Sequence, residues 1–291
     1  MAVKYFNFYQ GNKIHLGAAN EERAVDITAL GCGCPRTMRA LMQGGAEAER
    51  RVEDFLLAAQ TPALVMEKVR FAPVVESPEK ILCIGLNYAA HSEETKMKLP
   101  DYPELFSKFA SALHAAGAAI CLPRDAVQFD YEAELVIVMG RQAYQVPKEQ
   151  AREYIFGYTA GNDFSARDLQ MRTPQWLLGK TPDGFAPAGP YIVPEHELDT
   201  SDLHIQSFVN GELRQDDTTA NMIFDCSTLV SYISQYITLQ PGDLIYTGTP
   251  KGVILGYPEE QRVWLKAGDT VCVRIEGIGE LTNRLVGGSV G

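Results

Sequence analysis

Long hydrophobic runs are missing from the sequence: no segment approaches the roughly 20 consecutive apolar residues that a membrane-spanning helix needs. The N-terminal stretch MAVKYFNFYQGNKIH contains no apolar core followed by small residues, so we expect no secretory signal. Internal repeats and low-complexity tracts are absent too. Together these absences predict an ordinary globular protein without a membrane partner, which we expect in the cytoplasm.

Cysteine is also scarce, with six residues spread through a chain of 291. They form no CxxC pair, and Cys32-Gly33-Cys34 has neither a second cysteine pair nor a histidine cluster to complete a zinc site. We therefore expect reduced thiols rather than a disulfide framework or structural zinc.

Positive charge is in deficit, because 26 lysines and arginines face 37 aspartates and glutamates and leave a net charge of -11. Such a surface argues against nucleic acid or an anionic membrane as the main partner. An anionic substrate would therefore need a site that is locally positive.

Regular alternation of strands and helices is missing as well, and so is a glycine-rich phosphate loop. Short strand-like segments and frequent turn signals such as Asn210-Gly211 dominate instead, and they predict a mixed, β-dominated α+β fold. The proline-containing stretch 71–79 indicates a boundary between a small N-terminal α/β domain, residues 1–75, and a main domain, residues 76–291. We expect strands at 3–9, 24–27, 81–86, 132–139, 156–162, 189–193, 204–209, 243–246 and 270–275, and helices at 46–59, 148–154, 165–173 and 227–237.

What the sequence does contain is a strand-like segment that begins with acids, DYEAELVIVMG at residues 130–140. Asp130, Glu132 and Glu134 recur at period two, so in a regular strand their carboxylates share one face. Two carboxylates about 4 Å apart repel by roughly 4 kcal/mol even at an effective dielectric constant near 20. The face is therefore solvated, or it is neutralised by basic side chains or a cation. The apolar run that follows indicates burial and leaves these alternatives equally open.

A cation bound to these acids would be a hard one. An all-oxygen cluster without nearby histidine or cysteine selects Mg²⁺, Mn²⁺ or Ca²⁺ over zinc. Alternate strand positions supply two ligands, so a third has to come from elsewhere. Asp163, which follows the apolar segment 156–160, is the best candidate.

The residues after Asp163 form a second polar group. Ser165 to Asp168 fit a helix-capping pattern, and Arg167 and Gln170 then lie three residues apart on one helix face. Arg167 is either a surface partner of Asp163 or Asp168, or an anchor for a substrate carboxylate or carbonyl group.

A histidine and a carboxylate three residues apart form a third group. His91 and Glu94 follow the apolar segment 81–86, and one helical turn would bring their side chains into contact. A histidine oriented by a carboxylate is a common general base, although an exposed histidine in a helical loop is the simpler interpretation. The polar, proline-containing run 95–103 has the composition of a lid.

Two further segments carry candidate residues. Lys180, after the aromatic residue Trp176, is either a solvated charge or an electrophile that stabilises an enolate oxygen. Gly248 and Thr249 lie in a Thr-Gly-Thr-Pro turn, whose N–H groups and hydroxyls can bind a carboxylate. Neither segment alone distinguishes a functional site from an ordinary turn.

These segments, in this order, resemble the fumarylacetoacetate hydrolase family. The resemblance extends from about residue 81 to 283 and is carried by the motifs GLNYAAHSEE, FDYEAELVIVMG, GYTAGNDFSARDLQ, GKTPDGFAPAGPYIV, VNGELRQ and GDLIYTGTPKGV. It implies a mixed β-sandwich roll behind a variable small N-terminal domain, assembled as a homodimer. Within the family, the chain looks like an acylpyruvase or fumarylpyruvate hydrolase.

The resemblance also implies roles for individual residues. Mg²⁺ or Mn²⁺, with Ca²⁺ as a further option, would be bound by Glu132, Glu134 and Asp163, and no organic cofactor is expected. Asp130 is not a ligand in the family pattern, so we expect it at the solvated end of the strand. The catalytic residues would be His91, Glu94 and Lys180, and the substrate-binding residues Arg167, Gln170, Gly248 and Thr249.

The implied chemistry is metal-dependent hydrolysis of a C–C bond in a small anionic β-diketo acid of the acylpyruvate, fumarylpyruvate or fumarylacetoacetate type. His91 would activate water, and the metal and Lys180 would stabilise a pyruvate enolate. Decarboxylation of oxaloacetate and isomerisation of a 2-hydroxymuconate-type diacid would use the same site and stay open as alternatives. A metal-containing binding protein without turnover is a third alternative, against which the intact pair of His91 and Glu94 argues.

Overall fold

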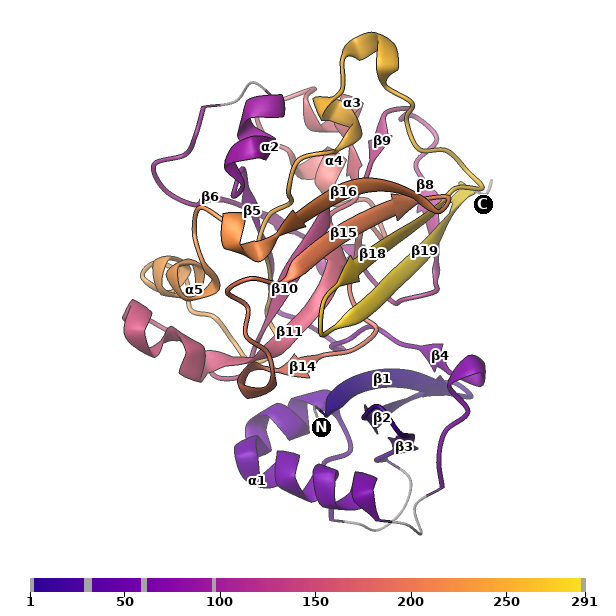
Figure 1. The fold of residues 1–291 in the computed structure, drawn as a ribbon, viewed down its shortest axis with the longest axis vertical. Coiled ribbons are helices and arrows are strands. Elements are labelled where there is room, and N and C mark those ends of the chain that lie inside the picture. Colours follow the sequence, from indigo (N-terminus) through magenta and orange to yellow (C-terminus); the bar gives the residue numbers. More distant parts are fainter. Residues whose placement is uncertain (1–2, 29–32, 59–61, 96–97, 289–291) are drawn as a thin grey trace.

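The computed structural model describes residues 3–28, 33–58, 62–95 and 98–288, and Figure 1 shows their arrangement. In these ranges the chain forms a four-stranded, a six-stranded and a five-stranded sheet, together with two small two-stranded sheets and several short helices. Cys32, Ala59 and residues 96–97 of the predicted lid lie outside the described residues, so the predictions made for them are untested.

The N-terminal unit is a four-stranded sheet, in the order β3-β2-β1-β4, with one long helix. Gly11, at φ +61°, makes the turn between the first two strands. Helix α1 begins after Thr37, whose hydroxyl accepts a hydrogen bond from the Ala40 N–H. The helix is interrupted at Gly45, and the sequence predicted only the part after this break. The elements are β1 (Lys4–Gln10), β2 (Lys13–Ala19), β3 (Ala24–Asp26), α1 (Met38–Leu57) and β4 (Arg70–Phe71).

The central sheet has six strands in the order β14-β11-β10-β17-β5-β6. Every residue of β10 and β11 is buried, because both faces of this sheet are covered. Leu135 and Ile137 of β10 lie in one hydrophobic core, whereas Val136 and Val138 lie in another. A strand buried on both faces carries apolar residues continuously, which explains the unbroken run in the sequence. The strands are β5 (Ile81–Gly85), β6 (Glu104–Lys108), β10 (Ala133–Met139), β11 (Ile155–Asn162), β14 (Val193–Pro194) and β17 (Leu244–Tyr246).

The five-stranded sheet, in the order β16-β15-β18-β19-β8, shares the first of these cores with the central sheet. Ile205 and Val273 belong to the five-stranded sheet, and Leu229 and Ile233 of helix α5 also pack in this core. The elements are β8 (Ala119–Leu122), β15 (His204–Val209), β16 (Glu212–Thr218), α5 (Cys226–Ser234), β18 (Thr270–Ile275) and β19 (Gly279–Gly287).

The second core joins the central sheet to the N-terminal unit. Tyr5 and Leu41 lie in the same hydrophobic cluster as Val136 and Val138. The backbone of Tyr5 exchanges two hydrogen bonds with Ile192, at 2.9 and 2.7 Å. The N-terminal unit is therefore packed against the same face of β10 that also carries Glu134.

Three short α-helices lie at one end of the molecule. Figure 1 shows α2, α3 and α4 at the upper end and the N-terminal unit at the lower end. The α-helices are α2 (Ala89–Glu94), α3 (Arg167–Gln170) and α4 (Leu177–Lys180), and the short strands are β7 (Leu113–His114), β9 (Phe129–Asp130), β12 (Ser165–Ala166) and β13 (Ala186–Pro187). The 3₁₀ helices are Met66–Lys68, Ala110–Ala112, Lys148–Tyr154, Glu195–Glu197, Thr219–Asn221, Ile254–Gly256 and Glu259–Gln261.

The predicted β-dominated α+β class is confirmed, with differences in single elements. Residues 148–154 form a 3₁₀ helix, and the strand expected at 189–193 is only β14 at its far end. The helix expected at 165–173 is shorter, because Ser165 belongs to β12. The Ser165 hydroxyl donates to the Asp163 carbonyl instead of capping a helix, so the predicted capping pattern is wrong. The division into domains 1–75 and 76–291 remains a prediction.

Candidate metal-binding and catalytic site

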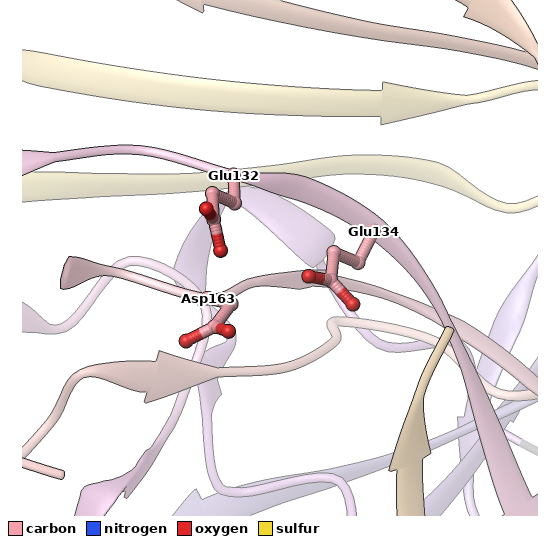
Figure 2. Close-up of side chains that lie close together, drawn as sticks. All are labelled: Glu132, Glu134 and Asp163. Carbon is pink, nitrogen blue, oxygen red and sulfur yellow. The ribbon is translucent and has the colours of Figure 1, made fainter. Parts of the chain in front are cut away.

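Three carboxylates converge at the end of the strand pair β10 and β11. Glu132 lies just before β10, Glu134 lies within it, and Asp163 follows β11. Figure 2 shows their carboxylate groups turned toward a common space, and one oxygen of each lies within 4.8 Å of the others. The Asp163 N–H donates to the Glu132 carbonyl at 2.9 Å, which ties the two chain segments together. All three residues are buried.

Two basic side chains neutralise part of this charge. Lys180 Nζ donates to Glu132 and, at 2.8 Å, to Asp163 Oδ2, and Arg167 Nη2 donates to Glu132 Oε1 at 2.7 Å. Burial would raise the pKa of Glu132, but Lys180 and Arg167 bring it below its ordinary value. Burial would lower the pKa of Lys180, yet Asp163 and Glu132 raise it. Lys180 therefore stays protonated, and its interpretation as a solvated surface charge is wrong.

Glu134 has a different environment. Its Oε2 accepts a hydrogen bond from the Gly248 N–H at 2.7 Å. Burial, followed by the negative charges of Asp163 and Glu132, raises the pKa of Glu134 well above its ordinary value. A cation beside this carboxylate would reverse that effect.

Lys108 is a buried lysine that the sequence did not indicate. Its ammonium group contacts Asp163 Oδ1 and donates to the Phe164 carbonyl at 3.1 Å and to the Phe185 carbonyl. No described donor reaches Asp163 Oδ1 with hydrogen-bond geometry, so Lys108 acts on this oxygen through its charge. Lys108 lies far from Asp163 in the chain and in no chemical motif, and only the fold brings the two together.

The donor set fits a divalent cation. Oxygen ligands of Mg²⁺ lie about 2.1 Å from the ion, so ligand oxygens of one ion are at most roughly 4 Å apart, and the three carboxylates, with oxygens within 4.8 Å of one another, could hold such an ion after a small adjustment. The carboxylates outnumber the basic groups by one, and a divalent ion would turn this excess into net positive charge. An anionic substrate would then be attracted. In this cluster the buried carboxylates are Asp130, Glu132, Glu134 and Asp163, and the buried basic groups are Lys108, Arg167 and Lys180.

His91 and Glu94 form a hydrogen-bonded pair on α2. His91 Nδ1 lies 2.8 Å from Glu94 Oε1, and Glu94 Oε2 accepts the Gly252 N–H at 2.9 Å. A carboxylate in its ionised form only accepts hydrogen bonds, so this contact favours the neutral tautomer of His91 that carries its proton on Nδ1 and its lone pair on Nε2. His91 is 6% exposed, so the interpretation as an exposed loop histidine is wrong.

Arg167 lies at the start of α3 and is buried. Its guanidinium group donates to Asp130 Oδ2 at 2.9 Å, and at 3.0 Å to Gln170 Oε1. Arg167 and Gln170, which were predicted to share one helix face, are therefore in contact. The alternative of a surface pair with Asp163 or Asp168 is wrong, because the partners of Arg167 are buried acids.

Asp130 was expected at a solvated strand end, and this prediction is wrong. Its side chain is fully buried and accepts the N–H groups of Ile254 at 2.8 Å and Leu255 at 3.0 Å, besides Arg167. The period-two pattern suggested one continuous strand, but β9 ends at Asp130 and pairs with Ser165 of β12. Asp130 thus holds the guanidinium group of Arg167 in place next to the carboxylate cluster.

Gly248 and Thr249 lie beside the carboxylates, after β17. The Thr249 hydroxyl donates to the Ala133 carbonyl at 2.9 Å and accepts a hydrogen bond from Gln215 Nε2 at 2.7 Å. Gln215, which the sequence did not single out as a site residue, is buried and also accepts the Ala133 N–H. The polar groups of this turn therefore hold the start of β10 in place.

Some of these side chains line a small cavity, among them His91, Glu132, Glu134, Arg167 and Lys180. Its volume of about 30 Å³ corresponds to one or two water molecules. A larger hollow of about 900 Å³ lies against β4 and residues 114–118, but none of the predicted site residues lines it. We place the chemistry in the smaller cavity because the titratable groups converge there. It is lined by Ile84, Gly85, Leu86, His91, Thr95, Phe106, Glu132, Glu134, Arg167, Gln170, Met171, Trp176, Lys180, Thr249 and Leu255.

The sequence and the fold were compared with those of known proteins. Residues 80–286 match the family model described as fumarylacetoacetate (FAA) hydrolase C-terminal. The sequence is 40% identical over 277 residues to the protein of Bos taurus named oxaloacetate tautomerase FAHD2B, mitochondrial, and the match covers 94% of this chain and 87% of that protein. No helix among the described residues is long and apolar enough to cross a membrane.

Two solved structures share the whole fold. A fumarylacetoacetate hydrolase from Exiguobacterium antarcticum matches with a TM-score of 0.87 and 34% identity, covering 98% of this chain and 100% of that chain. A maleylpyruvate hydrolase from Sphingobium sp. SYK-6, solved with manganese(II) and pyruvate, matches with a TM-score of 0.82 and 27% identity over 98% of this chain and 100% of that chain. Both matches include the N-terminal unit.

Proposed function

The chain belongs to the fumarylacetoacetate hydrolase family, and from the geometry of its site we propose that it is a divalent-metal-dependent enzyme that interconverts the keto and enol forms of a small β-keto diacid of the oxaloacetate type. One observation carries this proposal: His91 and Lys180 line the same small cavity as Glu132 and Glu134, two of the three clustered buried carboxylates. A base, a hard cation and a fixed ammonium group are what enolisation next to a carbonyl group requires.

His91 is the proposed base. Its Nε2 takes a proton from the carbon between the two carbonyl groups of the substrate and returns it to the enolate oxygen, so the reaction is an isomerisation without a net change in charge. Glu94, held by the Gly252 N–H, keeps the proton of the neutral ring on Nδ1 and stabilises the imidazolium that forms. A binding protein without turnover would not need this pair.

The remaining groups bind the substrate and stabilise charge. A divalent ion held by Glu132, Glu134 and Asp163 supplies Lewis acidity to the keto acid. Lys180 places a second positive charge next to the same carboxylates and is the proposed partner of the enolate oxygen. Arg167, Gln170 and Thr249 line the cavity and are proposed to bind the substrate carboxylates, for which Thr249 has to give up its hydrogen bond to the Ala133 carbonyl.

The size of the cavity favours a small substrate. A volume of about 30 Å³ does not admit a keto acid, so the lining side chains have to move when the substrate binds. A four-carbon diacid requires the least movement. Hydrolysis would need room for an acyl group and an attacking water molecule at the same time. The name of the 40% identical relative supports the same choice.

Hydrolysis of a C–C bond in an acylpyruvate is the second candidate. A histidine held by a carboxylate can also activate water, and the whole-chain structural match to a maleylpyruvate hydrolase supports this reaction. Both reactions pass through an enolate stabilised by the same groups. Decarboxylation of oxaloacetate is a third use of that enolate.

A substrate panel tests the proposal. With Mn²⁺ or Mg²⁺ present, the protein is expected to speed the loss of the ultraviolet absorbance of enol-oxaloacetate above the spontaneous rate, and a chelator is expected to remove this activity. His91→Gln is expected to lower kcat by about 10²–10⁴-fold while Mn²⁺ affinity is retained. Cleavage of acetylpyruvate or maleylpyruvate without tautomerisation of oxaloacetate would overturn the proposal in favour of the second candidate.

Location and assembly belong to the proposal as well. We propose a homodimer, which sedimentation of the purified protein tests. A cytoplasmic location remains a prediction, and the word mitochondrial in the name of the Bos taurus relative does not support it. Mg²⁺ and Mn²⁺ are equally suited to the three carboxylates.

A further inference from the structure

The segment that follows β17 provides backbone donors to three different carboxylates of the site. The Gly248 N–H donates to Glu134 at 2.7 Å, and the Gly252 N–H donates to Glu94 at 2.9 Å. The N–H groups of Ile254 and Leu255 donate to Asp130, as described above. Residues 248–256 therefore connect the candidate metal ligands, the pair of His91 and Glu94, and the support of Arg167.

Gly256 ends this segment and lies directly against Glu94. A Cβ atom at position 256 would lie 2.5 Å from Glu94 Cδ and 2.6 Å from Glu94 Oε2, closer than nonbonded atoms approach. Gly256 is not among the described glycines with positive φ, so its backbone conformation does not require glycine. What requires glycine here is the space that the Glu94 carboxylate occupies.

We propose that Gly256 is a positioning residue for the catalytic histidine. The missing side chain at 256 leaves room for the Glu94 carboxylate between His91 Nδ1 and the Gly252 N–H. Glu94 in turn fixes the tautomer and the orientation of the His91 ring. This inference depends on the proposed role of His91 as the base, and it adds a residue that no catalytic motif contains.

A methyl group at position 256 would act on the site more than on the fold. The atoms in its way form the end of a flexible side chain and not backbone, so Glu94 can turn aside. This rotation of the Glu94 side chain would separate its carboxylate from His91 and leave the Gly252 N–H without its carboxylate acceptor. The metal ligands are not among the atoms that the new Cβ would meet.

The test compares four proteins: Gly256→Ala, Glu94→Ala, the double variant and Gly287→Ala. Gly287 is the matched control, because a Cβ there would lie 4.0 Å from the Cβ of Ala267 and its φ is also not positive. Gly256→Ala is expected to lower kcat about 10- to 100-fold with little change in KM or Mn²⁺ affinity, and Gly287→Ala is expected to match the wild type. In a Glu94→Ala background, Gly256→Ala is expected to cost no further activity, because residues that act through one another are not additive.

A second measurement separates this inference from the proposed reaction. The ¹⁵N chemical shifts of the His91 ring report its tautomer without any substrate. They are expected to show one dominant tautomer in the wild type and in Gly287→Ala, and a mixture in Gly256→Ala and Glu94→Ala. If the shifts change as expected but no keto acid is turned over, the proposed reaction fails and the positioning role stands. An unchanged His91 tautomer in Gly256→Ala, or equal losses of activity with and without Glu94, would overturn the positioning role.

Discussion

Glu134 is the residue whose ionised carboxylate destabilises the metal-free fold but is required for the proposed binding of a cation. Its carboxyl group is buried 2.7 Å from the Gly248 N–H, and no ion pair of Glu134 occurs in the described part of the chain. The neighbouring charges of Asp163 and Glu132 add to the effect of burial and raise its pKa. Without a metal, Glu134 therefore stays protonated up to a higher pH than an ordinary glutamate, and a cation that binds there would have to displace this proton.

Replacement of Glu134 by glutamine is expected to stabilise the metal-free protein and weaken metal binding. Because the native pKa is raised, the unfolded chain releases its Glu134 proton at a lower pH than the native protein, and native stability falls as the pH rises above the ordinary pKa of 4.5. Glu134→Gln removes that loss while keeping an acceptor for Gly248. At pH 7.5 and without metal, the Tm of Glu134→Gln is expected to be higher than that of the wild type. The increase is about 2–4 °C for each kcal/mol by which the substitution raises the free energy of unfolding.

Thermal unfolding at several pH values checks this prediction. The difference in Tm between variant and wild type is expected to shrink as the pH falls toward 4.5. Mn²⁺ affinity, followed by calorimetry, is expected to fall at least about tenfold in Glu134→Gln. A variant that binds Mn²⁺ as tightly as the wild type would contradict the assignment of Glu134 as a ligand.

At the scale of elements, two helices of four residues each position much of the site. Arg167 and Gln170 belong to α3 and Lys180 to α4, and neither helix is long enough to be stable without tertiary contacts. They are held together by close backbone approach at Gly179. A Cβ atom there would lie 2.4 Å from the Gln170 nitrogen and 2.6 Å from the Ala166 carbonyl oxygen.

Gly179→Ala is therefore expected to push α3 and α4 apart. Two of the three nearest obstructing atoms belong to the backbone, whereas at Gly256 all three belong to the Glu94 side chain, so Gly179→Ala strains the fold itself. We expect a loss of stability of about 1–3 kcal/mol together with a loss of turnover, measured by denaturant unfolding and by the tautomerisation assay. Leu178→Ala is the matched control on the same helix, since Leu178 is 59% exposed. Equal stability of the two variants would show that the approach of α3 and α4 is not tight.

Much of the site could be predicted from the sequence, because its chemistry is concentrated in short segments. The contact between His91 and Glu94 is predicted by their helical spacing. The carboxylate cluster is predicted by the alternating acids Glu132 and Glu134 together with Asp163, which follows the next buried strand. Asp130 was misplaced, since alternation cannot reveal where one strand ends and a separate short strand begins. Lys108 and Gly256 were missed because each reaches its partner only through contacts between distant segments.

On the scale of the whole molecule, metal binding and folding are expected to be coupled. The candidate ligands come from segments near residues 132 and 163, so the proposed site exists only when the central sheet is formed. A ligand that binds only the native state stabilises it by about 2.7 kcal/mol at one hundred times its Kd. A net charge of -11 also favours association with a divalent cation.

Mn²⁺ is expected to raise the Tm of the metal-free protein in a concentration-dependent way, and a chelator is expected to reverse the shift. Asp163→Asn is expected to remove most of the shift, because it deletes one ligand charge and the partner of Lys108 and Lys180. Differential scanning calorimetry checks both results. A shift of the same size in Asp163→Asn would mean that the cation binds elsewhere.

The shared core between the N-terminal unit and β10 has a consequence for how this protein evolves. Val136 and Val138 pack in the same cluster as Tyr5, and Glu134 lies two residues before Val136 on the same face of β10. A substitution in the N-terminal unit can therefore shift the strand that carries a candidate ligand, and natural selection on the site extends to residues that no substrate touches. The match to the Bos taurus relative covers 94% of the chain, although the family model begins only at residue 80.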